Sequence, residues 1–458
     1  MRVNRRKFLG AGIAASFWSW SGGARAQGTS LAAGADGFVT LEAAPASLAL
    51  GAAAPTPVLA YNGIVPGPLL RIRRGDTLKV RLVNKLARPT TLSYPGLRAA
   101  NATMGFGGLT QPPVAPGARL DIRFAPPDSG FNLYMPHAGK LSTGQISQGL
   151  FGPIIVDEPT APPVDLEALV VLSDWRLDGQ GAVADLDDVK TARGAGRFGA
   201  VLSANAAPAS LRLEAAPGAR VRLRLANAAT ARLMTIAIEG AKTLIIAVDG
   251  QPSEAFEPLR NLIPIGPGAR FELMFDMPRE AGAVARFLLR GGDAAAIPGE
   301  TDRPLIVFEA KGDAVAARTA LAGLPANPRL PAEIALEASR RFDLTLSGGG
   351  DAPFAVNGVS FVDWPPKPAF QVARGTPVTL GLVNKTAYPQ AIRLNGHVAR
   401  LLHSLDDGWE PYWRDILLVQ PGKTVHAAFI ADNPGKWPIE SASPERRDAG
   451  LAAWFQVA

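Results

Sequence analysis

Histidine is the residue type in this sequence best suited to bind a transition metal, and the chain has only four, His137, His397, His403 and His426. Cysteine is absent, which excludes thiolate metal sites, cysteine nucleophiles and thiol redox chemistry. His397 and His403 are close in sequence, but neither strand nor loop geometry requires their side chains to face one another. His426 lies in an alternating segment, which predicts a half-exposed strand residue. The spacing of the histidines therefore indicates no metal site by itself.

Several other side chains could take part in chemistry, but a structural role is the favoured interpretation for each of them. Met104 with Phe106, and Met135, could form a soft-metal relay, but methionine more often fills gaps in a core. Four aromatic residues of the last third could form a binding platform, although packing against a sheet is favoured: Trp409, Tyr412, Trp413 and Trp437. No Ser-His-Asp spacing, phosphate-binding loop or carboxylate pair stands out in the sequence.

The elements that must position these side chains are short strands, because alternating segments such as residues 78–83 are separated by many glycine and proline residues. One unit of such strands recurs along the chain. The interval from Asn62 to Asn84 equals the interval from Asn205 to Asn227. In both copies a glycine, Gly75 or Gly218, follows the first asparagine at the same spacing. A fixed internal period of this kind indicates a repeated structural unit.

A third copy runs from Asn357 to Asn384 and is five residues longer. Each copy continues into a Pro-Gly turn and another alternating segment, and the turns are Pro116-Gly117, Pro267-Gly268 and Pro421-Gly422. A period of about 150 residues is too long for a solenoid, so each copy is predicted to be a domain. Proline-rich links at 159–163 and 324–331 place these domains at 27–160, 161–325 and 326–458. The polar, glycine-rich stretch 178–197 is predicted to be a surface loop.

Residues 1–26 predict an export signal that is not part of the fold. A basic head precedes a short apolar stretch, and Ala24-Arg25-Ala26 is the small-x-small pattern that signal peptidase reads. Arg5 and Arg6, directly before the apolar stretch, match the twin-arginine signal of bacterial proteins that are exported folded. We therefore expect the twin-arginine translocase as a partner during export, cleavage after Ala26, a periplasmic location and no stable membrane insertion.

The formal net charge of +7 is concentrated in this signal. The signal holds five of the 47 basic residues and no acidic residue, which leaves 42 basic and 40 acidic residues in the rest of the chain. A nearly neutral chain lacks the concentrated basic footprint of a nucleic-acid-binding protein. We therefore predict that the chain binds no nucleic acid.

Several motifs resemble those of the multicopper oxidase family. They occupy residues 61–68, 74–76, 80–84, 149–156 and 249–250, and residues 435–451 align without a gap with the last copper motif of the family. The resemblance covers essentially the whole chain after the signal. It implies an all-β fold of three cupredoxin-like Greek-key β-sandwich domains in the multicopper oxidase arrangement.

In this family four histidine-rich motifs, one of which includes a cysteine, hold copper, because imidazole and thiolate are suitable copper ligands. Of the eleven His or Cys positions that the resemblance assigns, ten carry another residue and only His137 is kept. The positions are Ser93 and Pro95 in the first motif, Met135 and His137 in the second, Gln390, Arg393 and Asn395 in the third, and Glu440, Ser441, Ala442 and Arg446 in the fourth. Leu451 occupies the axial position of the fourth motif.

These substitutions oppose copper binding. Arg393 and Arg446 would place permanent cations where copper ions lie in the family. Gln390, Asn395 and Glu440 could each bind a hard cation, but their spacing assembles no recognisable site. We therefore predict no metal, no cofactor, no catalytic residue and no copper oxidase activity, so that the chain is not an enzyme. A hydrogen-bonded structural role is the favoured interpretation of His137.

Two functional hypotheses follow. The favoured one is a non-catalytic role, because the copper-less sequence resembles the family's periplasmic cell-division member. That resemblance implies binding to periplasmic division proteins at the septum and support of the division machinery under stress. The alternative is a multicopper-oxidase-like enzyme or small-ligand binder that uses a remodelled cavity or another metal. The resemblance places Arg393, Glu440 and Arg446 along a cavity between the first and third domains, where an anionic ligand or a network of salt bridges would fit.

Overall fold

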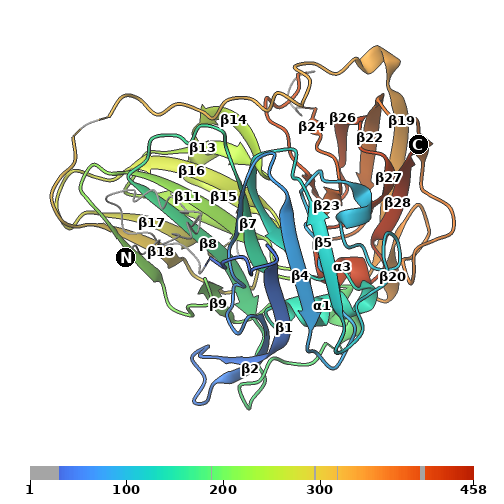
Figure 1. The fold of residues 1–458 in the computed structure, drawn as a ribbon, viewed down its shortest axis with the longest axis horizontal. Helices are drawn as coiled ribbons and strands as arrows, with labels where there is room; N and C mark the ends of the chain where they lie inside the picture. Colours follow the sequence, from blue (N-terminus) through green and yellow to red (C-terminus); the bar gives the residue numbers. More distant parts are fainter. Residues whose placement is uncertain (1–29, 187, 293–295, 317, 403–407) are drawn as a thin grey trace, which may run out of the picture.

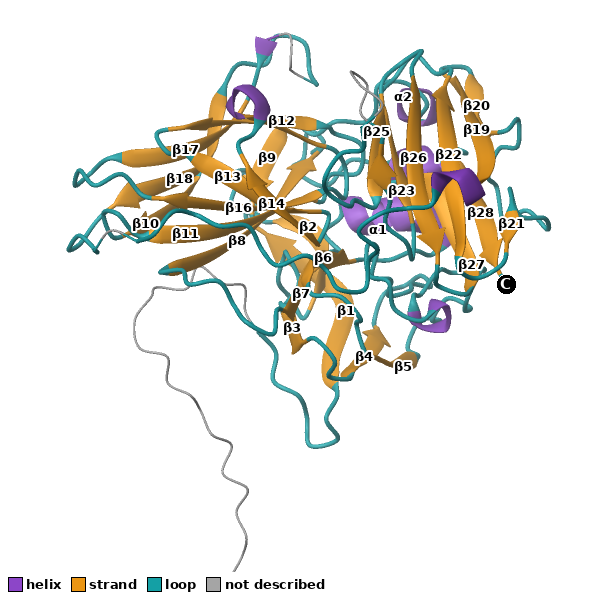
Figure 2. Ribbon diagram, turned by 90° about the horizontal axis from the view of Figure 1, so that it is seen from above, coloured by secondary structure: helices purple, strands orange, loops and turns teal. Residues whose placement is uncertain are grey.

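The computed structural model describes residues 30–458 except 187, 293–295, 317 and 403–407. The predicted export signal, with Arg5, Arg6 and Ala26, lies outside the described residues, as does His403. Three pairs of β-sheets make up the described chain, and each pair comes from one continuous stretch of sequence (Figure 1 and Figure 2). This arrangement confirms the predicted all-β class. The domain boundaries at residues 160 and 325 stay predictions.

The first pair of sheets comes from residues 39–157. One sheet has the strand order β2-β1-β4-β5 and the other has the order β3-β7-β6. The strands are β1 (Val39–Leu48), β2 (Thr56–Tyr61), β3 (Leu70–Arg73), β4 (Leu78–Asn84), β5 (Arg119–Phe124), β6 (Gly130–Tyr134) and β7 (Gly152–Asp157).

The second pair comes from residues 166–310, with the strand orders β14-β13-β16-β11-β8-β9 and β10-β18-β17-β12-β15. The strands are β8 (Leu166–Trp175), β9 (Val201–Ala204), β10 (Leu211–Ala215), β11 (Arg220–Asn227), β12 (Met234–Glu239), β13 (Thr243–Val248), β14 (Gln251–Phe256), β15 (Leu262–Ile265), β16 (Arg270–Asp276), β17 (Val284–Leu289) and β18 (Arg303–Ala310).

The third pair comes from residues 340–457, with the strand orders β20-β19-β22-β26-β24 and β21-β28-β27-β23-β25. The strands are β19 (Arg340–Gly349), β20 (Ala352–Val356), β21 (Gln371–Val372), β22 (Thr376–Asn384), β23 (Gln390–Leu394), β24 (Arg400–Leu401), β25 (Ile416–Val419), β26 (Thr424–Ala431), β27 (Gly435–Ser441) and β28 (Ala452–Val457).

The helices of the described chain are short and lie between strands: α1 (Ser142–Ser147), α2 (Val189–Ala192) and α3 (Pro444–Asp448), with 3-10 turns at Asn101–Thr103, Gly139–Leu141, Leu259–Asn261 and Leu336–Ala338. In the part of the chain that the structure describes, no helix has the length and apolar character needed to cross a membrane. Helix α2 and the buried side chain of Arg197 lie in the stretch predicted as a surface loop. That prediction is wrong at Arg197, because its guanidinium pairs with Glu445, a residue distant in sequence.

The three repeated units share one strand topology. The first long strand of each unit pairs in parallel with the strand that ends in the repeated asparagine: β1 with β4, β8 with β11, and β19 with β22. That second strand pairs antiparallel on its other side with β5, β16 and β26, respectively. The alternation in β4, where every second residue is buried, explains why the sequence pattern predicts a strand with one face in the core.

The asparagine that ends each of these strands has the same contacts in all three units. The side-chain amide of Asn84 donates to the carbonyl oxygens of Arg88 and Val114 and accepts from the backbone N–H of Leu86. Asn227 and Asn384 make the equivalent three hydrogen bonds. All three asparagines are buried, so each one joins backbone groups of the following loop to a carbonyl 30 to 38 residues further along the chain.

The first asparagine of each unit lies in a tight turn with a positive φ, 53° at Asn62 and 50° at both Asn205 and Asn357. Asparagine tolerates this left-handed conformation better than most residues. Its side chain also fixes the preceding strand, because Oδ1 accepts from a backbone N–H in β1, β8 or β19. The two repeated asparagines of the sequence therefore mark two sets of side-chain hydrogen bonds that recur in each unit.

The apolar core is continuous between the first and third pairs of sheets. One cluster of buried side chains includes Leu41, Val80 and Phe106 from the first pair and Leu380 and Trp437 from the third. The rings of Phe106 and Trp437 meet edge to face, with 6.1 Å between their centroids. A second cluster of buried side chains fills the second pair and also includes Ala391, Ile416 and Ala442 of the third. The polar site described next lies beside the contact between the first and third pairs.

Candidate functional site

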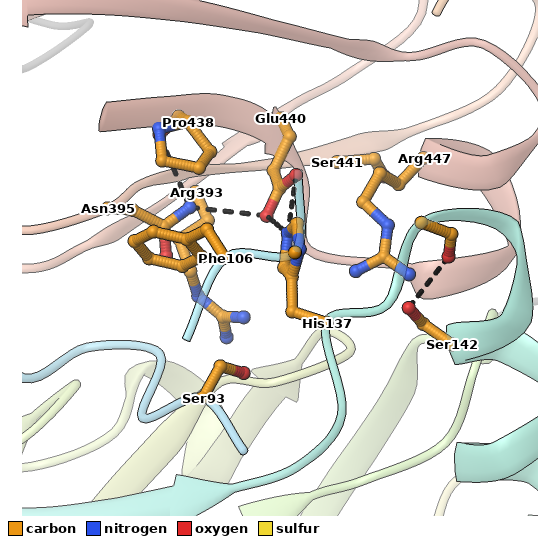
Figure 3. Close-up of polar contacts among 12 residues, drawn as sticks. Ser93, Phe106, His137, Ser142, Arg393, Asn395, Pro438, Glu440, Ser441 and Arg447 are labelled. Carbon is orange, nitrogen blue, oxygen red and sulfur yellow. Dashed lines mark hydrogen bonds and ion pairs between the residues drawn. The ribbon is translucent and has the colours of Figure 1, made fainter. Parts of the chain in front are cut away.

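Strand pairing brings the predicted ligand positions of the third and fourth motifs together. Strands β23 and β27 are antiparallel, and Arg393 lies opposite Glu440 in their register. Ser93 forms a bridge with Met135, and its hydroxyl donates to the Met135 carbonyl at 2.7 Å. These positions converge from segments that are far apart in the sequence, as Figure 3 shows.

The Glu440 carboxylate is the centre of one cluster. Nε2 of His137 lies 2.9 Å and 3.1 Å from its two oxygens, and the Asn395 amide donates to it at 3.2 Å. Because a carboxylate only accepts, His137 carries a proton on Nε2. The imidazole lies between Phe106, edge on at 5.1 Å, and Trp364, stacked at 5.9 Å. Nδ1 of His137 is buried with no hydrogen-bond partner among the described residues.

Charge around Glu440 keeps this carboxylate ionised. Burial raises its pKa, but the charge and hydrogen bond of His137 and the positive charges of Arg447 and Arg393 outweigh burial, so the pKa of Glu440 lies below its ordinary value. Glu440 is only 4% exposed. An ionised, buried carboxylate of this kind needs its cationic neighbours in place.

Arg393 belongs to a second set of contacts, which joins the third pair of sheets to the second. Its guanidinium donates to the carbonyl of Gly268 at 3.1 Å and pairs with Asp415 at 3.5 Å. Asp415 also accepts from Arg270 at 3.1 Å. Burial lowers the pKa of Arg393 and raises that of Asp415. Arg393 therefore neutralises buried carboxylates where the resemblance assigns a copper ligand.

Arg270 was not singled out from the sequence, yet it contacts all three parts of the molecule. Besides Asp415, it donates to the side chain of Asn132 at 2.9 Å and to the carbonyl of Asp249 at 2.8 Å. The Asp249 side chain accepts in turn from the backbone N–H of Ile416. The Asp249-Gly250 motif marked this region in the sequence, but it did not identify the arginine that the motif positions.

Arg447 is a second buried cation that sequence reasoning missed. It is 4% exposed and pairs with Asp448 at 2.8 Å, and Asp448 accepts from both the backbone N–H and the hydroxyl of Thr143 on α1. Figure 3 shows its guanidinium beside the His137–Glu440 pair. Helix α3 places this cation there, and a five-residue helix gives no periodic signal in a sequence.

Arg446 lies in a separate environment from Glu440. Its guanidinium donates to the carbonyls of Pro389 and Ala195 and to the side chain of Gln390, and it lies over the ring of Tyr388 at 5.6 Å. The expectation that Arg393, Glu440 and Arg446 line one cavity is therefore wrong. Arg446 contacts Gln390 at the start of β23, whereas Glu440 lies opposite Arg393 near the end of the same strand.

Beside Arg446 is a cavity of about 280 Å³, here called the Arg446 cavity. Its walls are mostly apolar and come from the second and third pairs of sheets: Ala195, Phe198, Ala231, Leu233, Pro267, Ala296, Tyr388, Pro389, Ala391, Leu418, Ser443 and Arg446. Burial lowers the pKa of Arg446 to about 10. This guanidinium remains cationic at neutral pH and faces the apolar space.

The other predicted ligand positions have structural contacts. Ser441 accepts from the backbone N–H of Ser443 at 3.2 Å, and the backbone N–H of Ala442 donates to Ala391. Pro95, Met135 and Leu451 are buried. Among the described residues, none of these five side chains forms a hydrogen bond or ion pair with the Glu440 carboxylate.

His397 is fully buried and surrounded by the rings of Phe429, Trp437 and Phe455. Burial lowers its pKa to about 3, so the imidazole is neutral at ordinary pH. Its Nδ1 lies 3.2 Å from the carbonyl of Asn395, and its Nε2 accepts from the backbone N–H of Asn433. These contacts give His397 a structural role, and His403 lies outside the described residues.

The remaining candidates also have structural contacts. His426 is half-buried, as expected, and lies 3.5 Å from Arg341. Met104, Phe106, Met135, Trp413 and Trp437 are buried core residues, whereas Trp409 and Tyr412 are partly exposed. Tyr412 stacks on Phe256 of the second pair of sheets. The aromatic group of the last third is therefore dispersed over the core and an interface, and it forms no single platform.

The donor set at these positions does not fit the copper centres of the resembling family. The one imidazole is engaged by Glu440 through Nε2, two positions are guanidinium groups that cannot ligate a cation, and a blue copper site needs a thiolate that this sequence lacks. The described residues contain no group of three or more His, Cys, Asp or Glu side chains arranged to hold a metal. A role for these side chains must therefore come from their own hydrogen bonds and charges.

Comparison with known proteins identifies the scaffold. Three segments match the multicopper oxidase family, residues 43–161, 169–297 and 333–458. The multicopper oxidase MmcO of Mycobacterium tuberculosis is 28% identical over 98% of this chain and 96% of its own length. A crystal structure of a multi-copper oxidase from Pseudomonas thermotolerans is 30% identical, covers 94% of this chain and all of its own, and superposes with a TM-score of 0.82. Lac15 from a marine microbial metagenome is 28% identical over 92% of this chain and all of its own, with a TM-score of 0.74.

These relatives correct one prediction from the sequence. The prediction that the chain is not an enzyme is contradicted, because the proteins that match it from end to end are oxidases. That prediction relied on the lost copper ligands, which determine what metal a site can hold and not whether the scaffold catalyses a reaction. The closer resemblance to the cell-division protein FtsP (also called SufI) is not shown by these relatives.

Proposed function

The chain belongs to the multicopper oxidase family, and we propose that it is an oxidase-like enzyme that takes a small organic anion in the Arg446 cavity. One observation carries this proposal: Arg446 is a buried cation that faces an apolar cavity and has only neutral hydrogen-bond partners. A buried charge is normally paired. A bound anion would supply the missing counter-charge.

The charge of Glu445 acts on Arg446, but among the described residues these two side chains form no hydrogen bond or ion pair with each other. Glu445 is adjacent in the chain, but one of its oxygens lies 3.2 Å from Nε of Arg197 and also accepts from the Arg197 backbone. Nε of Arg446 is buried with no hydrogen-bond partner among the described residues. A carboxylate or phenolate oxygen near this N–H would form a charge-assisted hydrogen bond.

The walls of the cavity favour a flat aromatic ligand. Phe198, Leu233 and Leu418 provide apolar surface, and the ring of Tyr388 lies against the guanidinium. The volume of about 280 Å³ is near the lower end of known ligand pockets, roughly 300 Å³. A single aromatic ring with one anionic group, such as 4-hydroxybenzoate, matches these dimensions and this charge.

Calorimetric titration of the purified chain with 4-hydroxybenzoate tests the proposal. Arg446→Gln should weaken binding by about tenfold or more, since a charge-assisted hydrogen bond is lost. Arg400→Gln is the matched control, because Arg400 also lies over an aromatic ring, that of Trp413, away from the cavity. Equal affinity in wild type and Arg446→Gln, or equal binding of neutral 4-hydroxybenzyl alcohol, would overturn the proposal.

The catalytic half of the proposal has its own test. Oxygen uptake with phenolic substrates is measured on protein supplied separately with copper, manganese, iron or zinc, together with the metal content of each sample. Turnover that Arg446→Gln abolishes would support an enzyme that uses the Arg446 cavity. Stoichiometric copper with turnover unaffected by Arg446→Gln would assign the activity to another site. No turnover with any metal would refute the catalytic half and leave the binding measurement standing.

We also propose that the chain reaches the periplasm through the twin-arginine route, which Arg5 and Arg6 support. Replacing both with lysine should leave unprocessed precursor in the cytoplasm of a bacterial host, as judged by fractionation and immunoblotting. The protein partners, the septal location and the division role stay predictions. In-cell crosslinking and growth of a deletion strain under osmotic and oxidative stress are the measurements that address them.

A further inference from the structure

A second cavity lies where the first pair of sheets, the second pair and the chain segment 324–328 meet. It shares no lining residue with the Arg446 cavity. We refer to it as the linker cavity. Its volume is about 280 Å³, and its lining includes Glu158, Ala247, Pro252, Glu272, Leu324 and Ala326. Most of this surface is apolar. The backbones of Gly130 and Gly250 meet at its wall so closely that a Cβ on Gly130 would lie 2.0 Å from the Gly250 carbonyl oxygen.

Glu272 is a buried polar residue in the lining of this cavity. It lies on β16 and is 1% exposed. Its Oε2 accepts from Nε of Arg222 at 2.8 Å and from Nε of Arg224 at 3.1 Å. Its Oε1 is buried with no hydrogen-bond partner among the described residues. A buried acceptor without a hydrogen bond is unfavourable, so a donor at this oxygen would stabilise the site.

Glu272 belongs to a network of arginine and carboxylate side chains. Three guanidinium groups, those of Arg71, Arg222 and Arg224, pair with four carboxylates, those of Asp157, Glu158, Glu167 and Glu272. Burial raises the pKa of Glu158, but the hydrogen bond and charge of Arg222 outweigh burial and keep it below the ordinary value. Both carboxylates that line the cavity are thus paired with the same arginine.

Among the described residues that line the linker cavity, the cationic side chain is that of Arg74. Arg74 is partly exposed, so water screens its charge more than that of the buried arginines. A ligand that donates a hydrogen bond and carries a positive charge would give Oε1 of Glu272 a charge-assisted hydrogen bond. An anion would meet Glu158 and Glu272 without a free buried cation among the described residues that line the cavity.

We propose that the linker cavity binds a small, mostly apolar primary amine whose ammonium group donates to Oε1 of Glu272. The apolar part of the amine packs against Ala247, Pro252 and Leu324. This site is independent of the Arg446 cavity and takes a ligand of the opposite charge. Since segment 324–328 forms one wall, an amine would also hold this link against the first two pairs of sheets.

Benzylamine is the probe, with benzyl alcohol as its neutral analogue and benzoate as its anionic analogue. Isothermal titration of the whole chain should show benzylamine binding about tenfold or more tightly than benzyl alcohol, because a charge-assisted hydrogen bond is stronger than a neutral one. Equal binding of the amine and the alcohol would overturn the role of Glu272, and failure of benzylamine to bind at all would overturn the site.

Two variants locate the amine. Glu272→Gln should weaken benzylamine by about tenfold or more, although loss of its pairs with Arg222 and Arg224 could prevent folding. Ala326→Leu fills the cavity from its exposed wall without touching the ionic cluster, and it should abolish binding. The matched control is Ala322→Leu, on the same segment but outside the lining, which should bind as wild type does. Unchanged binding in Ala326→Leu would refute the location. Arg446→Gln should retain benzylamine, which separates this test from that of the Arg446 cavity.

Discussion

Nε2 of His137 lies 2.9 Å from Oε1 of Glu440, although 303 residues separate the two in the chain. The one histidine kept at the assigned ligand positions thus pairs with a carboxylate that replaces another of those positions. The contact joins the loop after β6 to the end of β27 and lies at the boundary between the first and third pairs of sheets. Two positions that the resemblance assigns to copper ligands thus form a hydrogen-bonded pair.

Removing His137 should therefore destabilise the fold. His137→Ala leaves the buried, ionised Glu440 with Asn395 as its hydrogen-bonding side chain, and we expect a loss of about 3–5 kcal/mol in the free energy of unfolding. Urea unfolding followed by tryptophan fluorescence measures it. Replacing the pair together, as His137→Phe with Glu440→Leu, should cost less than His137→Ala alone. If the double variant lost as much unfolding free energy as His137→Phe and Glu440→Leu lose together when measured singly, the two side chains would not interact.

Glu440 should also make stability depend on acidity. Its pKa is lowered in the folded state from an ordinary value of 4.5, so its contribution is fully present above that value and is lost as the pH falls through the lower, folded value. The difference in unfolding free energy between wild type and Glu440→Gln should be constant near neutrality and shrink below pH 4.5. Denaturant titrations over a pH series measure this difference. A gap that stays constant into acid would show that Glu440 does not titrate there.

His397 should contribute a second, separate pH dependence. Burial lowers its pKa from 6.5 to about 3, so the unfolded chain takes up a proton below pH 6.5 that the folded chain does not bind until about pH 3. Stability should fall with decreasing pH in this window by about 1.4 kcal/mol per unit. His397→Gln should flatten this slope. The check is the slope of unfolding free energy between pH 6 and 4, and an identical slope in the variant would refute the assignment.

Arg270 should matter far more than a surface arginine. Arg270→Met leaves Asp415 short of a cation and removes hydrogen bonds to Asn132 and the Asp249 carbonyl, so we expect a loss of about 3–5 kcal/mol. Arg290→Met is the control, because Arg290 pairs with Asp302 while their side chains are 43% and 44% exposed. An exposed pair contributes about 0–1 kcal/mol. Differential scanning calorimetry compares the two variants, and similar midpoints would contradict the bridging role of Arg270.

The repeated asparagines should be equivalent. Asn227→Ala removes the hydrogen bonds to the carbonyls of Arg232 and Ile265, at a cost of about 0.5–1.5 kcal/mol for each bond. Asn84→Ala and Asn384→Ala should have losses of similar size, since they break the same three hydrogen bonds. Asn227→Asp should be worse than Asn227→Ala, because a carboxylate cannot donate to two carbonyl oxygens. Chemical denaturation measures all four, and tolerance of Asn227→Asp would refute the inferred donor role.

The fold could be predicted from the sequence because its signals are local. Asn62 and Asn84 mark a turn and a strand end by their own chemistry, so a repeat of both positions identified the repeated β unit. The site was predicted only in part. Arg270, Asp415 and Arg447 acquire their roles from partners in other sheets, and no spacing in the sequence relates Arg270 to Asn132. The separation of Arg446 from Glu440 likewise depends on how β23 lies between their two environments.

The shared core of the first and third pairs of sheets has a consequence for biosynthesis. Phe106 is translated long before Trp437, so the N-terminal half of that core emerges from the ribosome with no partner to cover it. Most of the core of the second pair of sheets comes from residues 166–310, so this pair can begin to assemble before the third pair is made. A nascent chain therefore completes its fold only when the final strands are released. A truncated product would expose apolar surface, which makes it a target for chaperones and proteases and a poor passenger for a translocase that accepts folded cargo.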